Sequence, residues 1–312
     1  MKIVLTGGCG YIGSRLTEAL LDDGHDVTVV DCLWFGNHLR PHARLRVIEA
    51  DVREAEKIPL SGVEAVIHLA NVANDPSGEL NAKLTWEVNA LATMGLVEHA
   101  IRNGVRQFIH ASSGSVYGVK EEPQVTEDLS LVPISDYNKT KMISERVLLS
   151  YRDRITLQCI RPATVCGVSP RMRLDVAVNM LTVQALTRKR ITVFGGNQLR
   201  PNITLRDMVR VYQHFLALGE RATGIFNAGF ENISILDIAR MVTDLVPAEI
   251  DISPSNDPRS YRLNSDRLLA TGFAPRHGVR DAIQEVIEAF RAGTLRVEDD
   301  CYNVKAMKRL AL

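Results

Sequence analysis

The chain has 312 residues, of which 46% are hydrophobic and 24% are charged. This composition is typical of a folded globular protein and excludes a disordered or collagen-like chain. Lys and Arg total 37, and so do Asp and Glu, so the formal net charge is zero. No basic excess is therefore available to follow a nucleic-acid backbone.

Cysteine usage and hydropathy predict the compartment. The five cysteines are odd in number, widely scattered and without CxxC spacing: Cys9, Cys32, Cys159, Cys166 and Cys301. Free thiols and no zinc site are expected from such a pattern. The chain opens on an apolar strand-like run rather than a leader, and no apolar stretch reaches the ~18 residues that span a bilayer. We expect a cytoplasmic protein that binds no metal, membrane or nucleic acid.

In the first half, short runs rich in Val and Ile alternate with segments of helical period. The runs are apolar on both faces, as parallel strands covered by helices are. The expected strands are Lys2–Thr6, Asp26–Val30, Leu45–Glu49, Ala65–Leu69, Gln107–Ala111 and Thr156–Ile160. The expected helices are Tyr11–Asp23, Leu84–Asn103 and Tyr137–Tyr151. This alternation predicts an α/β fold with a Rossmann-type, doubly wound parallel sheet.

Beyond about residue 165 the alternation loosens, and Gly, Pro and Arg become frequent. Helices are expected at Val176–Arg188, Leu205–Leu218 and Ile235–Leu245, separated by short strands. We divide the chain into a dinucleotide-binding domain, residues 1–165, and a smaller α/β lobe, residues 166–312. Segments within about 191–235 are expected to return to the first domain, and the polar tail after Arg291 to be loosely packed.

A glycine-rich turn, TGGCGYIG at residues 6–13, follows the first strand and opens the first helix. Glycines permit a tight turn and close approach of the backbone to a diphosphate, which the free N–H groups of the helix attract. Asp31 ends the second strand, where a carboxylate binds ribose hydroxyls and favours NAD over NADP. Asp51 and Val52, after the third strand, are candidates to lie near the adenine. Considered alone, the glycines are equally explained by an ordinary strand-to-helix turn, and Asp31 by a strand-end cap.

Tyr137 and Lys141 are four residues apart, so on a helix their side chains share a face. A phenol is a weak base at neutral pH, and a nearby ammonium favours the phenolate, so the pair is a candidate acid/base. A solvated helix face explains the spacing equally well. Ser112 and Ser113 follow the fifth expected strand, at the edge where doubly wound sheets bind ligands.

These motifs in this order resemble the extended short-chain dehydrogenase/reductases, in particular the nucleotide-sugar epimerases and dehydratases. The resemblance rests on TGGCGYIG, on SSGSVYG at residues 112–118 and on YNKTK at residues 137–141. Residues 67–70, IHLA, resemble the family's fourth-strand motif HLAA, from which Asn71 departs. Asn89, Arg161-Pro162 and Arg206-Asp207 also fall at family-like positions, and the resemblance covers about residues 1–290.

The resemblance implies a role for each matching residue. Tyr137 would be the catalytic acid/base, Lys141 would lower its pKa and bind the nicotinamide ribose, and Ser113, or its neighbour Ser112, would hydrogen-bond the reacting sugar oxygen. The implied NAD-binding residues are Gly7, Gly10, Tyr11, Ile12, Gly13, Asp31, Asp51, Val52, Leu69, Ala70, Asn89, Tyr137 and Lys141. The implied ligands of a nucleotide diphosphate sugar are Ser113, Asn179, Arg200 and Arg259, since arginine forks match phosphate oxygens.

The residues after Ser113 favour one reaction. The resemblance places Gly114 and Ser115 where 4,6-dehydratases of the family carry Asp-Glu. UDP-glucuronate decarboxylases carry a Glu in this stretch, and 3,5-epimerases carry a Cys at the place of Ser115. Neither Gly114 nor Ser115 is a usable acid or base for those reactions. What remains is a NAD-dependent 4-epimerase with a transient 4-keto intermediate. The alternatives are a nucleotide-sugar 4-ketoreductase or dehydrogenase with net redox change, and a non-catalytic NAD(H)-binding regulator.

Other reactive residues are assigned to packing. Cys166 replaces Tyr of the family's VYGP motif and is expected to be inert, and His68 and His110 are expected to be core histidines with satisfied hydrogen bonds. An apolar stripe runs through Leu91, Met94, Leu96 and Val97. It permits a homodimer through the helices at 84–103 and 137–151, as in the family it resembles, and it equally suits packing on the sheet.

Overall fold

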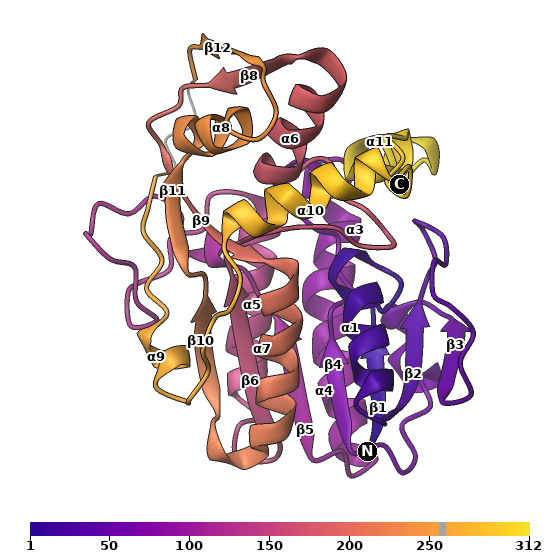
Figure 1. Cartoon of the computed structure of the whole chain (residues 1–312). Helices are drawn as coiled ribbons and strands as arrows, with labels where there is room; N and C mark the ends of the chain where they lie inside the picture. Colours follow the sequence, from indigo (N-terminus) through magenta and orange to yellow (C-terminus); the bar gives the residue numbers. More distant parts are fainter. Residues whose placement is uncertain (256–259) are drawn as a thin grey trace.

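The computed structural model describes residues 1–255 and 260–312. Its larger part is a seven-stranded sheet with the order β10-β6-β5-β4-β1-β2-β3, in which all neighbours are parallel (Figure 1). The strands are β1 (Lys2–Thr6), β2 (Asp26–Asp31), β3 (Leu45–Glu49), β4 (Ala65–His68), β5 (Gln107–Ala111), β6 (Thr156–Pro162) and β10 (Gly224–Ala228). The order of strands reverses between β1 and β4, which places a ligand-binding crevice at their carboxyl ends. The predicted Rossmann-type fold is confirmed.

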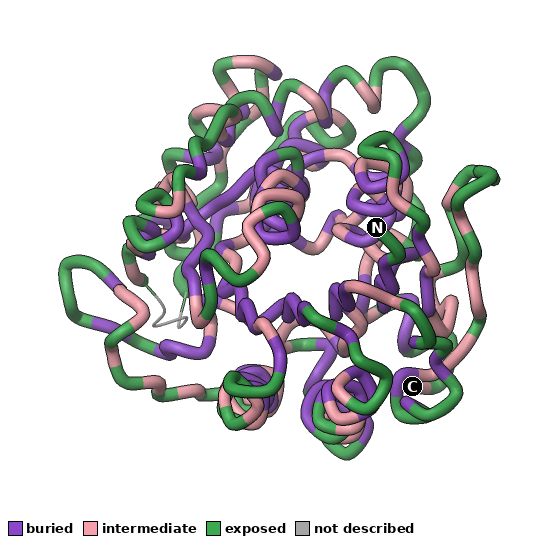
Figure 2. Tube along the Cα trace, turned by 90° about the horizontal axis from the view of Figure 1, so that it is seen from below, coloured by how far each residue is buried: buried purple, intermediate pink, exposed green. Residues whose placement is uncertain are grey.

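Helices cover both faces of this sheet, because its strands are apolar on both sides. Ile3 and Leu5 of β1 pack in one buried cluster and Val4, between them, packs in another on the opposite face. The covering helices are α1 (Tyr11–Asp22) and α7 (Leu205–Leu218) on the first face, and α4 (Ala92–Arg102) and α5 (Asp136–Leu149) on the second. Figure 2 shows the helices on the two sides of the sheet, with exposed positions on the helices as well as on the loops.

The helix expected at Leu84–Asn103 is interrupted. It consists of α3 (Ala82–Trp86), one π-helical turn (Glu87–Leu91) and α4. The predicted apolar stripe divides between two faces of the helix: Leu96 and Val97 are fully buried, whereas Leu91 is 58% exposed and Met94 39%. π turns of this kind often lie at functional sites.

The smaller lobe contains a three-stranded sheet, β11-β9-β7, and a two-stranded sheet, β12-β8. Its strands are β7 (Thr164–Cys166), β8 (Arg190–Phe194), β9 (Leu199–Thr204), β11 (Glu231–Ser234) and β12 (Glu249–Ser253). Its helices are α6 (Ala177–Arg188), α8 (Ile235–Thr243) and α10 (Val279–Arg291), which share a third buried cluster. The segment at about residues 191–235 was expected to return to the main sheet. Within it, β10 joins the main sheet and α7 packs on that sheet, whereas β8 stays in the smaller lobe.

The expectation of a loosely packed tail is wrong. Helix α11 (Asn303–Arg309) folds back toward the main sheet, and Ala306 and Met307 are each 1% exposed. Met307 joins the buried cluster that also holds Leu96 and Val97. The remaining short helices are α2 (Asp75–Gly78), α9 (Asp266–Leu269) and the 3-10 turns Val52–Lys57, Gly114–Tyr117, Gly219–Arg221 and Asp299–Cys301.

Several predicted absences can be compared with the described residues. All five cysteines are free thiols, as expected. Within residues 1–255 and 260–312, no group of three or more His, Cys, Asp or Glu side chains is arranged to hold a metal ion. None of the helices described is both long and apolar enough to cross a bilayer.

Candidate functional site

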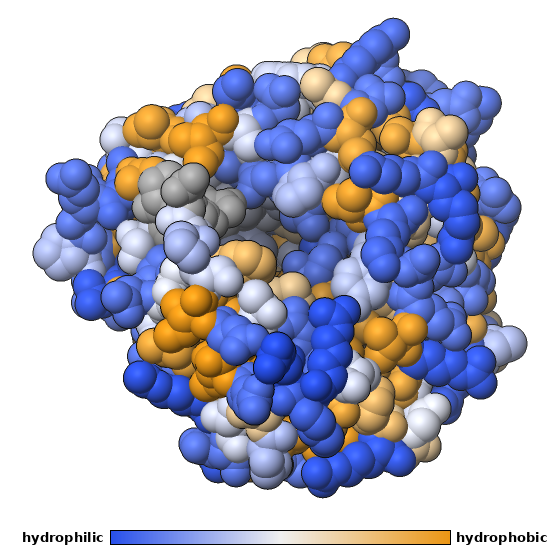
Figure 3. Space-filling view, turned by 90° about the horizontal axis from the view of Figure 1, so that it is seen from above, coloured by the Kyte–Doolittle hydropathy of each residue, from blue (hydrophilic) through white to orange (hydrophobic). Residues whose placement is uncertain are grey.

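A cavity of about 680 Å³ lies at the carboxyl ends of the sheet strands, beneath the smaller lobe. Figure 3 shows polar and apolar side chains mixed around the hollow on this face. Among the residues singled out from the sequence, those that line the cavity are Gly7, Gly10, Tyr11, Ile12, Gly13, Asp31, Asp51, Val52, Leu69, Ala70, Ser112, Ser113, Tyr137 and Arg200. Asn89, Lys141 and Asn179 do not line it, and Arg259 lies outside the described residues.

The glycine turn has the shape that a diphosphate requires. Gly7 has a φ of +73°, and a Cβ there would lie 2.6 Å from the backbone nitrogen of Ala70; a Cβ at Gly13 would collide with the carbonyl oxygen of Gly7. Gly10 caps α1 without a side chain that competes for the N–H groups of the first turn. The open N-terminus of α1 therefore faces the cavity and suits an anion.

Two carboxylates stand at the ends of the neighbouring strands. Asp31 accepts hydrogen bonds from the backbone nitrogens of Cys9 and Leu33, each 2.9 Å long, and its burial raises the pKa of the carboxyl. It thus caps the strand end and also presents its carboxylate to the cavity. Burial opposes ionisation of Asp51 as well, but hydrogen bonds from Arg53 outweigh it and hold the pKa of Asp51 below its ordinary value.

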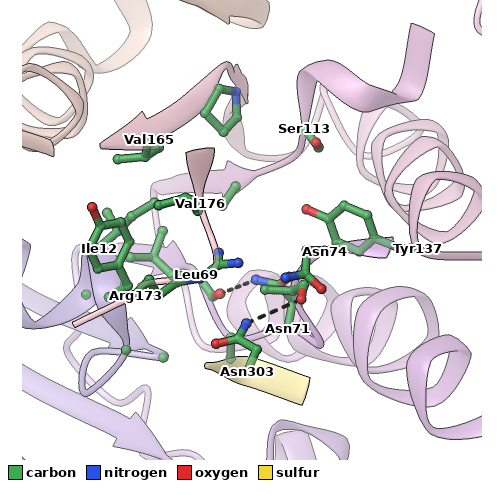
Figure 4. Close-up of a pocket in the computed structure, with 18 of the residues that line it drawn as sticks. Ile12, Leu69, Asn71, Asn74, Ser113, Tyr137, Val165, Arg173, Val176 and Asn303 are labelled. Atoms are coloured by element: carbon green, nitrogen blue, oxygen red, sulfur yellow. Dashed lines mark hydrogen bonds between the residues drawn. The ribbon is translucent and has the colours of Figure 1, made fainter. Parts of the chain in front are cut away.

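Tyr137 and Ser113 meet at the far end of the cavity, where Figure 4 shows the phenol directed toward the serine. Burial raises the pKa of Tyr137, and its hydrogen bond with Ser113 partly offsets the effect. The Ser113 hydroxyl also lies 2.7 Å from that of Ser115. Ser112 donates instead to the buried Glu145. Of the two candidate serines, Ser113 is therefore the one that accompanies Tyr137.

Lys141 lies below this pair, fully buried. Its Nζ donates to the carbonyl oxygen of Ala111, at 2.8 Å, and burial lowers the pKa of Lys141 to about 7, against the opposing effect of Glu145. The expectation that Lys141 would lower the pKa of Tyr137 is not met in the chain alone, because burial dominates and the pKa of Tyr137 lies above its ordinary value.

Asn179 and Asn89 hold loops in place. Asn179 accepts from the backbone nitrogen of Gly167 and donates to the Tyr11 hydroxyl and to the carbonyl oxygen of Arg173, so its amide has its partners within the protein, away from the cavity. Asn179 does not line the cavity, and its contact with a diphosphate stays a prediction. Asn89, on the π turn, bonds both backbone groups of Val72 and so supports the cavity wall indirectly.

The histidine predictions have different outcomes. His68 bonds the hydroxyls of Thr6, at 2.7 Å, and Thr93, at 2.9 Å, as expected of a satisfied core histidine. His110 is equally buried, but neither ring nitrogen has a partner among the described residues, so its prediction is wrong. Cys166 is buried with its Sγ 3.5 Å from the carbonyl oxygen of Ile203, and burial raises the pKa of its thiol. That environment suits packing rather than nucleophilic chemistry.

A second wall of the cavity contains residues to which the sequence analysis assigned no binding role. Arg171, Arg173 and Asp175 line it from the loop between β7 and α6, and Asn303 and Val304 line it from α11. The density of arginine after residue 165 was the available signal for the loop. No local pattern marks Asn303, because only the fold brings α11 to the cavity.

A glycine turn between β1 and α1, a carboxylate at the end of β2 and a Ser–Tyr pair at the far end of the crevice define an enzyme of the dinucleotide-binding Rossmann class. Residues 3–229 match the model of the NAD dependent epimerase/dehydratase family, and the chain belongs to this family. Its cofactor is NAD. Two observations fit this dinucleotide. The glycine turn has no room for a Cβ at Gly7 or Gly13, and the Asp31 carboxylate is held by a hydrogen bond from the backbone nitrogen of Cys9.

The similarity to known proteins extends over nearly the whole chain. The UDP-glucose 4-epimerase of Corynebacterium glutamicum is 29% identical over 316 residues, covering 93% of this chain and 95% of that protein. The UDP-glucuronic acid decarboxylase 1 of Xenopus tropicalis is 29% identical over 310 residues, covering 93% and 72%. The structure of MoeE5 in complex with UDP-glucose and NAD is 26% identical, covers 95% and 100%, and has a TM-score of 0.82. Because different reactions occur among these relatives, the likeness defines the family and not the reaction.

Proposed function

We propose that the protein is a NAD-dependent nucleotide-sugar epimerase that acts at C4 through a transient 4-keto sugar. The observation that carries the proposal is the surroundings of the Ser113–Tyr137 pair. A Ser–Tyr pair suffices to hold and move the proton of a sugar hydroxyl, whereas elimination or decarboxylation needs a further acid or base. The two positions that follow Ser113 are Gly114 and Ser115, and neither has a carboxyl group.

NAD, when bound, supplies the hydride acceptor and later the donor. The chain's own residues supply the proton transfer: Tyr137, as the phenolate, accepts the proton of the C4 hydroxyl and, as the phenol, returns it, and Ser113 hydrogen-bonds the same oxygen. Lys141, beneath them, is proposed to bind the nicotinamide ribose once NAD occupies the cavity. Arg200 lines the cavity and is proposed as a ligand of the substrate diphosphate, as is Arg259. A UDP-sugar is the proposed substrate class, since relatives named for UDP-sugars support it.

The deciding experiment incubates the purified protein with UDP-, GDP-, CDP- and dTDP-sugars, UDP-glucose and UDP-glucuronic acid among them, and follows products by NMR and absorbance near 340 nm. Formation of the C4 isomer without net absorbance change is the expected result. Net formation or loss of NADH would favour the ketoreductase or dehydrogenase alternative. No turnover with any sugar would leave the NAD(H)-binding regulator.

Substitution of the phenol tests the same proposal at one atom. Tyr137→Phe should retain NAD while losing turnover by about 10²–10⁴-fold, the usual contribution of a positioned acid/base. Tyr151→Phe, just beyond the end of α5, is the control, because Tyr151 bonds Glu98 on the protein's outer surface. Unchanged turnover of Tyr137→Phe would refute the assigned role.

We also propose that the protein is a homodimer through α4 and α5, the helices expected to pair. These helices pack side by side, and Leu91 and Met94 lie exposed next to them. An exposed apolar pair at the start of α4, which packs on α5, supports a contact with a second copy that buries it.

A further inference from the structure

Arg171 is a buried arginine without a direct ion-pair partner among the described residues, although the more distant Asp175 and Asp31 carboxylates act on its charge. Its side chain is part of the cavity wall, and the residue is only 4% exposed. Among the described residues, no carboxylate forms an ion pair with it, and its Nε has no hydrogen-bond partner. Buried arginines are almost always paired, because an isolated buried charge is costly. The unpartnered Nε, in a guanidinium without a direct ion pair, therefore indicates an anion that occupies this part of the cavity.

The contacts of Arg171 place it on the cofactor side of the cavity. Its guanidinium lies 3.9 Å from the centre of the Phe35 ring, in the loop that follows Asp31. Its charge acts on the Asp31 carboxyl, whose pKa it lowers against the effect of burial. Burial lowers the pKa of Arg171 itself to about 10, so the side chain remains a cation at neutral pH. Arg200 lines the cavity from β9, in the smaller lobe.

We propose that Arg171 binds the diphosphate of NAD, opposite the N-terminus of α1, and that Asn303 of the C-terminal segment orients it. The Arg171 Nη2 donates to the Asn303 Oδ1 at 2.6 Å, which fixes the guanidinium and leaves Nε for the anion. An arginine fork matches the oxygens of a diphosphate, and the helix N-terminus on the other side supplies N–H donors. The Arg171 guanidinium and the N-terminus of α1 together neutralise the diphosphate, which α1 alone would bind from one side.

Asn303 is itself held on both sides of the cavity. Its backbone nitrogen donates to Asp175 at 3.1 Å, and its Nδ2 donates to the carbonyl oxygen of Ala73 at 3.4 Å. Figure 4 shows Asn303 beside Asn71 and Asn74 at the edge of the cavity. The neighbouring Cys301 accepts a 2.8 Å hydrogen bond from the backbone nitrogen of Leu174. The C-terminal segment thus joins the loop after β4 to the loop that carries Arg171, and this connection retains NAD in the enzyme.

The test compares Arg171→Met and Asn303→Ala with Arg309→Met, an exposed arginine of the same C-terminal helix. NAD retained per chain after purification is measured, and calorimetry then gives the affinities for ADP-ribose, adenosine and UDP. Arg171→Met should retain less NAD and bind ADP-ribose about tenfold or more weakly, as for loss of a charge-assisted hydrogen bond. Its affinities for adenosine and for UDP should stay unchanged. Asn303→Ala should show a smaller loss for ADP-ribose, and Arg309→Met none.

Three results would overturn the proposal. These are an unchanged affinity of Arg171→Met for ADP-ribose, an equal loss for adenosine, and a loss confined to UDP, which would assign Arg171 to the substrate diphosphate instead. Circular dichroism of each variant identifies any that fail to fold, and Arg171→Lys then serves in place of Arg171→Met, with a smaller loss expected. No sugar substrate is present in these assays, so their outcome does not depend on which reaction the enzyme catalyses.

Discussion

The side chain of Lys141 sits in a position that is unfavourable for a charge. It is fully buried, its Nζ is bound to the carbonyl oxygen of Ala111, and its burial lowers its pKa from 10.5 to about 7. Between these two pH values the unfolded chain carries more protons at this position than the folded chain does. Folding therefore becomes more favourable as pH rises through this window. A residue maintained at such a cost is expected at a functional site.

Substitution of this lysine should change how stability depends on pH. The Lys141→Met variant lacks the buried ammonium, so its melting temperature relative to the parent should be highest near pH 7 and should fall as pH approaches 10. The measurement is thermal unfolding across this range, in samples matched for NAD content. Lys139→Met, at an exposed position on the same helix, is the control and should differ from the parent by a constant amount. A pH-independent difference for Lys141→Met would contradict the assignment.

Site residues whose positions are set by the adjoining strand, turn or helix were predictable from the sequence. The glycine turn and Asp31 line the cavity because a strand, a turn and a helix follow one another in the chain. Ser113 and Tyr137 are likewise placed by the ends of β5 and α5. The direction of the Asn179 amide was not predictable, because it depends on hydrogen bonds with Tyr11 and Gly167 that only the fold creates. Arg171 was given no role of its own for the same reason, since its contact with Asn303 of α11 depends on the fold.

At the scale of elements, α5 is the part of the fold that must be placed accurately, because it carries Tyr137 and Lys141. One turn further along, Glu145 is fully buried and accepts two hydrogen bonds from Arg161 of β6, at 2.8 and 2.6 Å. It also accepts from Ser112. This ion pair joins α5 to the ends of β5 and β6, so it fixes the distance between the Ser113 hydroxyl and the helix.

Breaking that pair should be costly. Glu145→Gln should lower the free energy of unfolding by about 3–5 kcal/mol, because it leaves the Arg161 guanidinium buried without its counter-ion. Urea unfolding measures the loss. Glu249→Gln removes an exposed ion pair with Arg190 and should cost about 0–1 kcal/mol. Equal, small losses in both variants would show that the buried pair does not secure α5.

Elements with a strong local pattern were predicted nearly to the residue. β1, β3, β5 and α7 have the expected bounds, because their apolar periodicity is uninterrupted. The π turn at Glu87–Leu91 was not expected, since it inserts a residue into a helix without changing the hydrophobic pattern. The tail was misjudged because α11 has few apolar residues and is stabilised by packing against a distant part of the chain.

At the scale of the whole molecule, the chain is electrically neutral, yet three arginines line a single cavity. The α/β sheet contributes the glycine turn and the Ser–Tyr pair, and the lobe and the C-terminal segment contribute the arginines and Asn303. Net charge therefore does not exclude a local site for a small anion. Because Asp31, Asp51, Asp75 and Asp175 line the same cavity, phosphate binding is proposed for individual arginines and not for a net positive charge of the cavity.

The same scale includes the proposed association of two copies. Leu91 is 58% exposed on the surface formed by α4 and α5, and Ile252 of β12 is equally exposed on the smaller lobe. If the helices form the dimer contact, Leu91→Asp should convert a dimer to a monomer, because it places a charge in an apolar interface, and Ile252→Asp should not. Sedimentation velocity of the parent and both variants at micromolar concentration measures the mass. A monomeric parent, or a dimer that survives Leu91→Asp, would exclude this face as the contact.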